Sequence, residues 1–180
     1  MIDLFWDFDE GGFFFYGKDG EELLARPKEV YDGATPSGNS VAASNLLRLA
    51  RLTGDQQLTE YSRRQLEAFS GYLEEQPQAH THFLTALQFA LYPGTEVVIA
   101  GDPGHNVTKT MIKVAQQGFS PNTVLILKPG GEAGQEIVSM IPFVKEHQPI
   151  NGSSTAYVCR NYACQAPTTG VEELARAFND

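Results

Sequence analysis

Apolar residues recur every three or four positions over three segments in the first half of the chain, which predicts three helices. The first segment covers residues 37–52 and stops at Gly54, a residue suited to a helix end. The second follows Asp55, a good N-cap, and continues to Pro77. The third runs from about residue 78 to 91. Because only two residues separate the first two helices, we expect them to pack antiparallel as a hairpin.

The segment before these helices has a different pattern. Residues 12–16 are mostly aromatic, residues 17–20 read as a turn, and residues 21–25 can form a return strand. This arrangement predicts a β-hairpin near the N-terminus.

In the second half the pattern changes to short apolar, β-branched runs. Residues 97–100 and 123–127 are typical of buried strands, and residues 107–117 between them have helical spacing, so together they predict a β-α-β unit. The remaining expected elements are a helix at 135–144, a strand at 155–159 and a closing helix at 171–178. A small parallel or mixed sheet follows from this order.

The change of pattern falls at residues 91–94, where a Pro-Gly turn signal separates helical from strand-like sequence. We therefore expect a helical subdomain over residues 1–92 and a small α/β subdomain over residues 93–180. The fold class expected from the pattern alone is mixed α and β.

Composition and charge exclude several classes of function for this chain. The chain has 180 residues and a net charge of −9, with no basic cluster, which argues against a nucleic-acid surface. No apolar stretch reaches the ~18 residues that a membrane span needs, and no secretory signal is visible. Two cysteines are too few for a disulfide scaffold, so we expect a reducing, cytoplasmic setting. We expect no cofactor.

Residues 8–14 combine carboxylates with a Gly-Gly turn and aromatic rings. Such a set suits a sugar, because aromatic faces cover its C–H patches while Asp9 and Glu10 accept hydrogen bonds from hydroxyls. The alternative is structural: the glycines permit positive φ, and Phe13 and its aromatic neighbours belong to the core.

Two further loops also allow either a ligand-binding or a structural interpretation. In residues 32–40, Ser37, Asn39 or Ser40 could cap the following helix, or the helix N-terminus could hold a ligand. Residues 101–106 lie between a strand and a helix, where some folds bind phosphate, but they lack the spacing of a dinucleotide or P-loop motif. We interpret the second loop as a strand-to-helix turn.

Cys159 and Cys164 are separated by four residues, unlike the two-residue gap of thioredoxin-type redox pairs. We favour two partly buried free thiols, with a reversible disulfide as the alternative. No histidine pair has convincing metal-ligand spacing, and two cysteines cannot complete a tetrahedral zinc site, so no metal is expected. No Gly-x-Ser-x-Gly nucleophile motif is present.

Several of these blocks together resemble a known family. They are residues 8–15, 26–28, 32–43 and 155–159, with Cys164 and Pro167. Over nearly its whole length the chain resembles the C-terminal part of large thioredoxin-domain-containing proteins related to the spermatogenesis-associated thioredoxin-like proteins. The resemblance implies a parent several times longer, with an N-terminal thioredoxin-like domain and an (α/α) six-hairpin toroid. This chain would hold helical hairpins of a partial toroid, followed by the small α/β unit.

The resemblance also implies a site. The Gly-Gly-Phe block is similar to a loop at the toroid rim of N-acylglucosamine 2-epimerases, which would place Asp9, Glu10 and Phe13 along the central cavity. Asp32 and Asn39 would lie nearby. The epimerases' catalytic histidines and arginines lie on helices that this sequence does not include.

Three hypotheses follow. In the first, the parent acts on a carbohydrate, Asp9, Glu10 and Asp32 are acid/base or hydroxyl-binding candidates, and Phe13, Ser37 and Asn39 are ligand-binding candidates. In the second, the chain is a non-catalytic scaffold that presents the thioredoxin-like domain. In the third, Cys159 and Cys164 accept electrons from the parent's N-terminal cysteine pair.

The expected partners are the parent's thioredoxin-like domain, the rest of its toroid and a sugar-like ligand, with neither nucleic acid nor membrane. Apolar edges that the absent hairpins would cover should also promote self-association.

Overall fold

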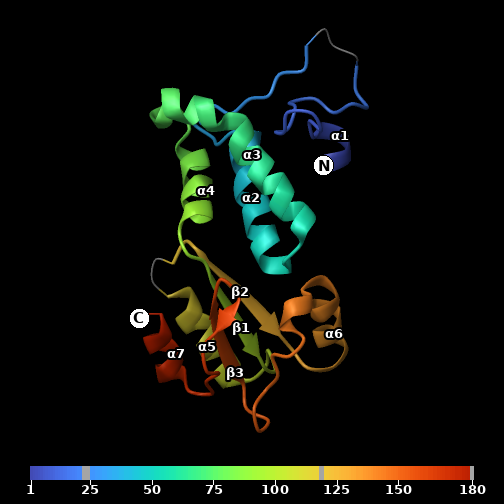
Figure 1. The fold of residues 1–180 in the computed structure, drawn as a ribbon. Coiled ribbons are helices and arrows are strands. Elements are labelled where there is room, and N and C mark those ends of the chain that lie inside the picture. The colour runs from blue at the N-terminus through green and yellow to red at the C-terminus, as the bar shows by residue number, and fades with distance from the viewer. Residues whose placement is uncertain (22–24, 118–119, 179–180) are drawn as a thin grey trace. The chain divides into compact units, whose positions relative to one another are not determined.

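The computed structural model describes residues 1–21, 25–117 and 120–178, and the fold is mixed α/β (Figure 1). The chain divides into two compact units. Unit 1 comprises Met1–Ala50 and Asp55–Leu91, and unit 2 comprises Arg51–Gly54 and the chain from Tyr92 onward.

Unit 1 is helical. Its elements are α1 (Ile2–Phe5), α2 (Gly38–Thr53, whose last three residues belong to unit 2), α3 (Gln56–Glu75), the 3₁₀ turn η1 (Pro77–Ala79) and α4 (Thr81–Leu91). The three expected helices are confirmed. The third begins later than predicted because Pro77, which cannot donate a backbone hydrogen bond, starts a separate 3₁₀ turn.

The caps that delimit these helices match the sequence signals. The Asp55 side chain accepts hydrogen bonds from the N–H groups of Gln57 (2.7 Å) and Leu58 (3.1 Å), and Gly54 has a φ of +71° between α2 and α3. Behind the caps, α2 and α3 share two buried clusters. One contains Ala43, Phe69 and Phe83; the other contains Trp6, Phe13, Ala42 and Leu46, with Leu58 and Tyr61 against it.

The predicted N-terminal β-hairpin is wrong for residues 12–16, which form no strand. Phe13 makes a single antiparallel bridge with Trp6, and the N–H of Phe15 donates to the carbonyl of Pro27. Residues 22–24 of the expected return strand lie outside the described residues. The aromatic run therefore pairs with the chain on either side of it instead of with an adjacent strand.

Unit 2 contains a four-stranded mixed sheet in the order β2-β1-β3-β4. The strands are β1 (Thr95–Ala100), β2 (Thr123–Lys128), β3 (Thr155–Arg160) and β4 (Ala163–Cys164); β1 and β2 are parallel, and the other pairs are antiparallel. The predicted β-α-β unit is confirmed, with α5 (Asn106–Gln116) as its crossover helix.

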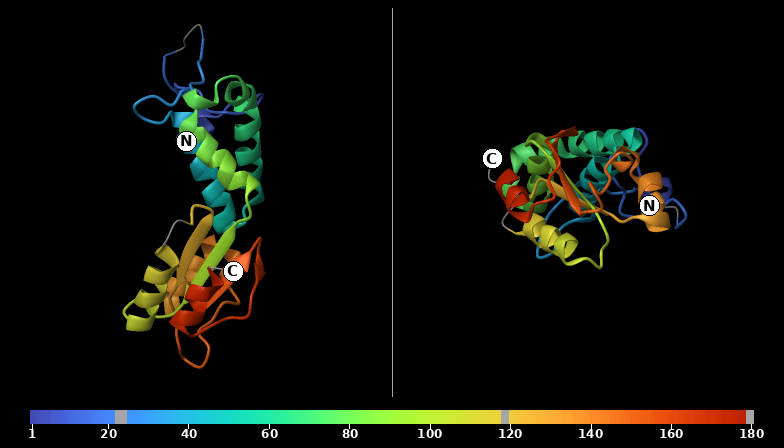
Figure 2. Two further views of the ribbon diagram at one scale, coloured as in Figure 1. Left: turned by 90° about the vertical axis from the view of Figure 1, so that its left-hand side faces the viewer. Right: turned by 90° about the horizontal axis from the view of Figure 1, so that it is seen from below.

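Helices cover both faces of this sheet. Side chains of α5 and α7 (Val171–Ala177) pack on one face against Val97, Ile99 and Val158. Residues of α6 (Gly131–Met140) and the 3₁₀ turn η2 (Pro142–Val144) pack on the other face against Val98 and Ile126. Figure 2 shows these elements from two further sides. The predicted helix at 135–144 begins earlier and ends before Pro142.

Among the helices that the structure describes, none combines the length and the apolar character needed to cross a membrane.

Candidate functional site

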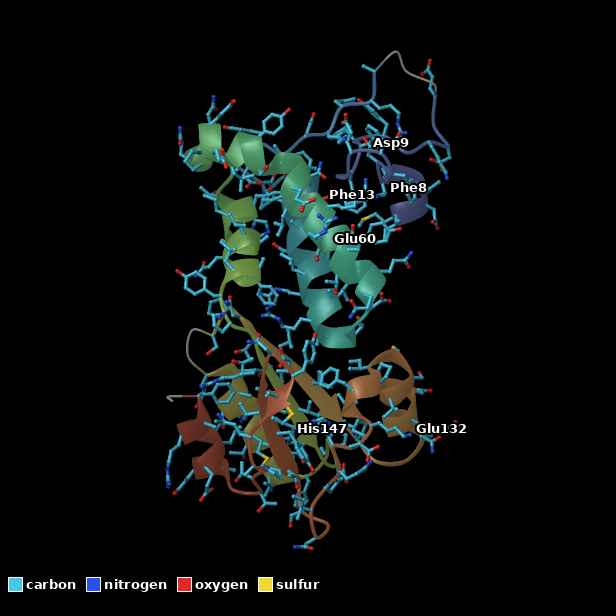
Figure 3. The ribbon with its side chains drawn as sticks, in the orientation of Figure 1. Phe8, Asp9, Phe13, Glu60, Glu132 and His147 are labelled. Atoms are coloured by element: carbon cyan, nitrogen blue, oxygen red, sulfur yellow. A yellow bond between two sulfur atoms is a disulfide. The ribbon has the colours of Figure 1, made fainter. Side chains whose placement is uncertain are left out.

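Asp7 organises the turn that follows Trp6 in unit 1. Its Oδ1 accepts hydrogen bonds from the backbone N–H groups of Asp9 (2.9 Å) and Glu10 (3.1 Å). The turn leaves the side chains of Phe8, Asp9 and Glu10 exposed, and Figure 3 shows Phe8 and Asp9 on this segment. One buried carboxylate therefore positions two exposed ones.

Lys28 completes this arrangement. Its Nζ lies 2.6 Å from Oδ2 of Asp7, donates to the carbonyl of Gly11 at 2.9 Å, and lies 3.3 Å from Oε2 of Glu10. Burial alone would raise the pKa of Asp7, but the bond from Lys28 and the two backbone N–H groups bring that pKa below its usual value. Asp7 therefore carries a charge that Lys28 balances within the fold.

Gly11 and Gly12 both have a φ of +81°, which favours glycine. A Cβ on Gly11 would lie 2.8 Å from the carbonyl oxygen of Arg64, and a Cβ on Gly12 would lie 3.0 Å from the Phe69 ring. The conformational interpretation of these glycines is confirmed.

A cavity of about 440 Å³ opens beside this turn, entirely within unit 1. Its lining combines aromatic rings with four acidic and two basic side chains. The lining residues are Asp3, Leu4, Trp6, Asp7, Phe8, Asp9, Glu10, Phe14, Lys18 and Arg26. Of the sequence-predicted residues, Asp9 and Glu10 meet in this cavity.

Within the part of the chain that the structure describes, two lining residues carry buried N–H groups that find no acceptor. They are Nε1 of Trp6 and Nε of Arg26. The guanidinium of Arg26 lies 4.0 Å from the centroid of the Phe14 ring, and its Nη2 donates to the carbonyl of Tyr16 at 2.8 Å. An unpaired buried donor is uncommon and needs an explanation. Both nitrogens have almost no solvent-accessible surface, so Trp6 and Arg26 line the cavity mainly through their other atoms.

Phe13 and Asn39 lie in the core, away from the cavity lining. Phe13 is 6% exposed and packs edge-on against Trp6, with ring centroids 4.9 Å apart. The Oδ1 of Asn39 accepts hydrogen bonds from the N–H of Phe13 and from Nε2 of Gln65, and its Nδ2 donates to the carbonyls of Phe13 and Glu29. Both residues hold the fold in this structure, and neither presents a free group to a ligand.

Asp32 and Ser37 act as caps. The Oδ2 of Asp32 accepts hydrogen bonds from the N–H groups of His82 (2.8 Å) and Phe83 (3.1 Å) at the start of α4, and its Oδ1 accepts one from Ser37. The Oγ of Ser37 accepts a hydrogen bond from the N–H of Ser40. The capping interpretation of residues 32–40 is confirmed for Ser37 at the start of α2. Asp32 was not among the predicted caps, and it caps a different helix, α4.

Asp102 lies in the turn between β1 and α5 and accepts a hydrogen bond from the N–H of Gly104 at 2.7 Å. This confirms the interpretation of residues 101–106 as a strand-to-helix turn.

In unit 2, Cys159 and Cys164 form a disulfide, so the interpretation as two free thiols is wrong for this structure. The reason is a hairpin that the sequence pattern did not reveal. Asn161 and Tyr162 have φ values of +51° and +64°, which is typical of the two-residue turn that joins antiparallel strands. The turn places Cys159 of β3 directly opposite Cys164 of β4.

His147 lies beside this disulfide, with Nε2 3.6 Å from Sγ of Cys164. Figure 3 labels His147 next to the sheet of unit 2. Burial, and then the nearby charge of Lys128, lower the pKa of His147 below its usual value, so the imidazole is neutral near pH 7. Sequence reasoning missed this neighbour because His147 and Cys164 come from separate segments of the chain.

One nitrogen of His147 and the two sulfur atoms lie within 4.8 Å of one another. Metal binding by cysteine requires thiolates, and both sulfurs are joined in the disulfide. In this oxidised state the three residues do not form a metal site.

No family model matches the chain. It is 36% identical over 177 residues to human spermatogenesis-associated protein 20, covering 98% of this chain and 22% of the human protein. The rat protein of the same name is 35% identical over the same length and with the same coverage. An uncharacterised protein of Caenorhabditis elegans is 25% identical over 176 residues, covering 97% of this chain and 23% of its own.

These similarities confirm the predicted relationship to spermatogenesis-associated proteins at the level of sequence. The chain spans about a fifth of the length of the curated relatives it matches. The expected (α/α) toroid and its likeness to sugar epimerases stay predictions.

Proposed function

We propose that unit 1 binds a small, neutral, sugar-like molecule in the cavity beside the turn at Asp7. The observation that carries this proposal is the lining, in which exposed carboxylates and aromatic rings surround about 440 Å³, with two unpaired N–H donors buried in the wall behind them. A polyhydroxylated ring matches each of these groups.

The carboxylates of Asp9 and Glu10 would accept hydrogen bonds from ligand hydroxyls. Phe8, which is 58% exposed, offers a ring face for the C–H patches of a sugar. The unpaired donors on Trp6 and Arg26 would gain acceptors from ligand oxygens after a small movement of the wall. A general acid or base role for either carboxylate stays a prediction.

Charge favours a neutral ligand over a phosphorylated one. The lining contains four acidic and two basic side chains, and Lys28 pairs with two of the acidic ones, Asp7 and Glu10. A small negative excess therefore remains, and it disfavours a phosphate. The protonated amine of an amino sugar would be attracted by the acidic side chains of the lining. The ligand class is therefore a neutral or amine-bearing sugar rather than a sugar phosphate.

Calorimetric titration with a hexose, a hexosamine and a hexose phosphate tests the proposal. We expect the first two to bind and the phosphate to bind more weakly. Asp9→Asn should weaken binding about tenfold, the usual loss for one hydrogen bond to a charged group. Asp19→Asn is the matched control, because Asp19 is an exposed carboxylate of the same segment outside the lining. Equal affinity of both variants would refute this site.

The scaffold function is the second candidate, and exposed apolar side chains favour it. Val41 and Leu49, eight residues apart on α2, are 39% and 46% exposed, and Tyr72 on α3 is 58% exposed. Exposed apolar side chains of this kind would contact the rest of a longer parent, including its thioredoxin-like domain, or a second copy of the chain. Replacing Val41 and Leu49 together by serine should then shift a self-associated chain toward monomer in sedimentation velocity. An unchanged distribution would exclude Val41 and Leu49 as a contact between copies of the chain.

A further inference from the structure

The disulfide in unit 2 joins a buried cysteine to an exposed one. Cys159 is 0% exposed on β3, whereas Cys164 is exposed on β4, the last strand at one edge of the sheet. An incoming thiolate can therefore approach the disulfide at Cys164. The sulfur that leaves in such an attack is that of Cys159.

Release of Cys159 as an unprotonated thiolate is unfavourable. The site is buried, and Cys159 lies opposite the buried carboxylate of Glu96 in the sheet register. A nearby group that can deliver a proton removes this obstacle. His147 is placed for that role, since its ring lies against Cys164 and within 4.8 Å of both sulfur atoms.

The neighbours of His147 hold it in place. The Nζ of Lys128 donates to the backbone carbonyl of His147 at 2.7 Å, and the imidazole packs edge-on against Tyr157, with ring centroids 4.5 Å apart. Among the described residues, its buried Nδ1 makes no hydrogen bond of good geometry, although the backbone of Phe143 and Val144 lies close enough to favour the protonated ring. The ring is thus positioned by backbone and packing contacts, with Nε2 facing Sγ of Cys164.

We propose that Cys159 and Cys164 form a thiol–disulfide exchange site, in which His147 transfers the proton and the partner is a dithiol. The imidazole takes the proton from the first thiol, whose sulfur bonds to Cys164 as the Cys159–Cys164 bond breaks. The imidazolium then gives that proton to Cys159. The second thiol then gives its proton to His147 and attacks the partner's first sulfur, and Cys164 leaves and takes that proton from the imidazolium. The dithiol is thereby oxidised to a disulfide, and the protein disulfide is reduced to two thiols.

The position of attack is tested on the unaltered chain with glutathione. Because glutathione has one thiol, it can trap the mixed disulfide, which peptide mapping by mass spectrometry then locates. We expect the adduct on Cys164 and a free thiol on Cys159. An adduct mainly on Cys159, or reduction no faster than that of an oxidised peptide covering residues 158–165, would overturn the proposal.

The role of His147 is tested by the rate of reduction with dithiothreitol, measured by quenching with an alkylating reagent. His147→Gln should slow reduction by about tenfold or more, since general acid–base groups contribute at least that much. His105→Gln is the control, because His105 is an exposed histidine of unit 2 at the start of α5. Folded His147→Gln protein that reacts as fast as the unaltered chain would overturn the role of His147. If this variant does not fold, the glutathione adduct and the peptide comparison decide the proposal.

Discussion

Asn39 binds both backbone polar groups of Phe13. Its Oδ1 accepts the Phe13 N–H at 2.8 Å, and its Nδ2 donates to the Phe13 carbonyl at 2.9 Å. The side chain therefore substitutes for a neighbouring β-strand and fixes the aromatic segment against α2. This pairing, formed across 26 residues of sequence, positions the loop that lines the cavity of unit 1.

Removing the Asn39 amide should destabilise unit 1. Asn39→Ala leaves the buried N–H and carbonyl of Phe13 without their partner, and we expect a loss of about 2–3 kcal/mol in the free energy of unfolding. Asn45→Ala is the matched control, because Asn45 is an exposed asparagine of the same helix. Urea denaturation measures both. Similar small losses for the two variants would contradict the structural role of Asn39.

Asp32 should affect stability and leave ligand affinity unchanged. Asp32→Ala removes the acceptor for two N–H groups at the start of α4, and loss of a cap costs about 1–2 kcal/mol. Because Asp32 is absent from the cavity lining, sugar affinity measured by calorimetry should not change. Weaker binding at unchanged stability would show that Asp32 is a ligand group.

Local signals in the sequence predicted the longer helices and the strands β1 to β3, whereas the predicted N-terminal hairpin was wrong and β4 was missed. Asp55 and Gly54 marked the α2–α3 junction, and the β-branched runs marked β1 and β2. Side-chain pairings across distant residues could not be predicted, because no local pattern reports them. Asn39 with Phe13, Asp7 with Lys28 and His147 with Cys164 are such cases.

The candidate site was predicted in part for the same reason. Asp9 and Glu10 were recognised from their aromatic and glycine neighbours, and both line the cavity. Trp6 and Arg26 were missed, because their significance lies in unpaired buried nitrogens that only three-dimensional packing shows. Asn161 is a weak signal for the turn that brings the two cysteines together, because asparagine tolerates positive φ, but Tyr162 at the next position does not favour such a turn.

Acid should weaken unit 1 through Asp7. The pKa of Asp7 in the folded state lies below its unfolded value of 3.8, so its contribution to stability is fully present above pH 3.8 and is lost as the pH falls through the folded pKa. The difference in unfolding free energy between the unaltered chain and Asp7→Asn should therefore be large at about pH 6 and shrink below about pH 4. A constant difference over this range would contradict the role of the charge.

Glu96 should show the opposite dependence. Burial raises its pKa above 4.5, against the opposing effects of the Tyr162 backbone N–H and the Arg51 charge. Its contribution to stability is therefore fully present below pH 4.5 and is lost as the pH rises through the folded pKa. Relative to the unaltered chain, Glu96→Gln should gain stability as the pH rises from about 4.5 toward 7, as measured by urea denaturation. A relative loss over this range would contradict the prediction.

The indole N–H of Trp6 offers the most direct test of ligand binding in unit 1. Trp6 is the single tryptophan of the chain, so its indole gives one resonance in a proton–nitrogen correlation spectrum, and it lines the proposed cavity. The spectrum would be recorded during titration with a neutral hexose and a hexosamine. The same titrations would be repeated with Phe8→Ala and, as the exposed aromatic control outside the lining, Phe15→Ala. Our account predicts a saturable shift of this resonance that Phe8→Ala weakens and Phe15→Ala retains. An indole resonance that moves with neither sugar would contradict it.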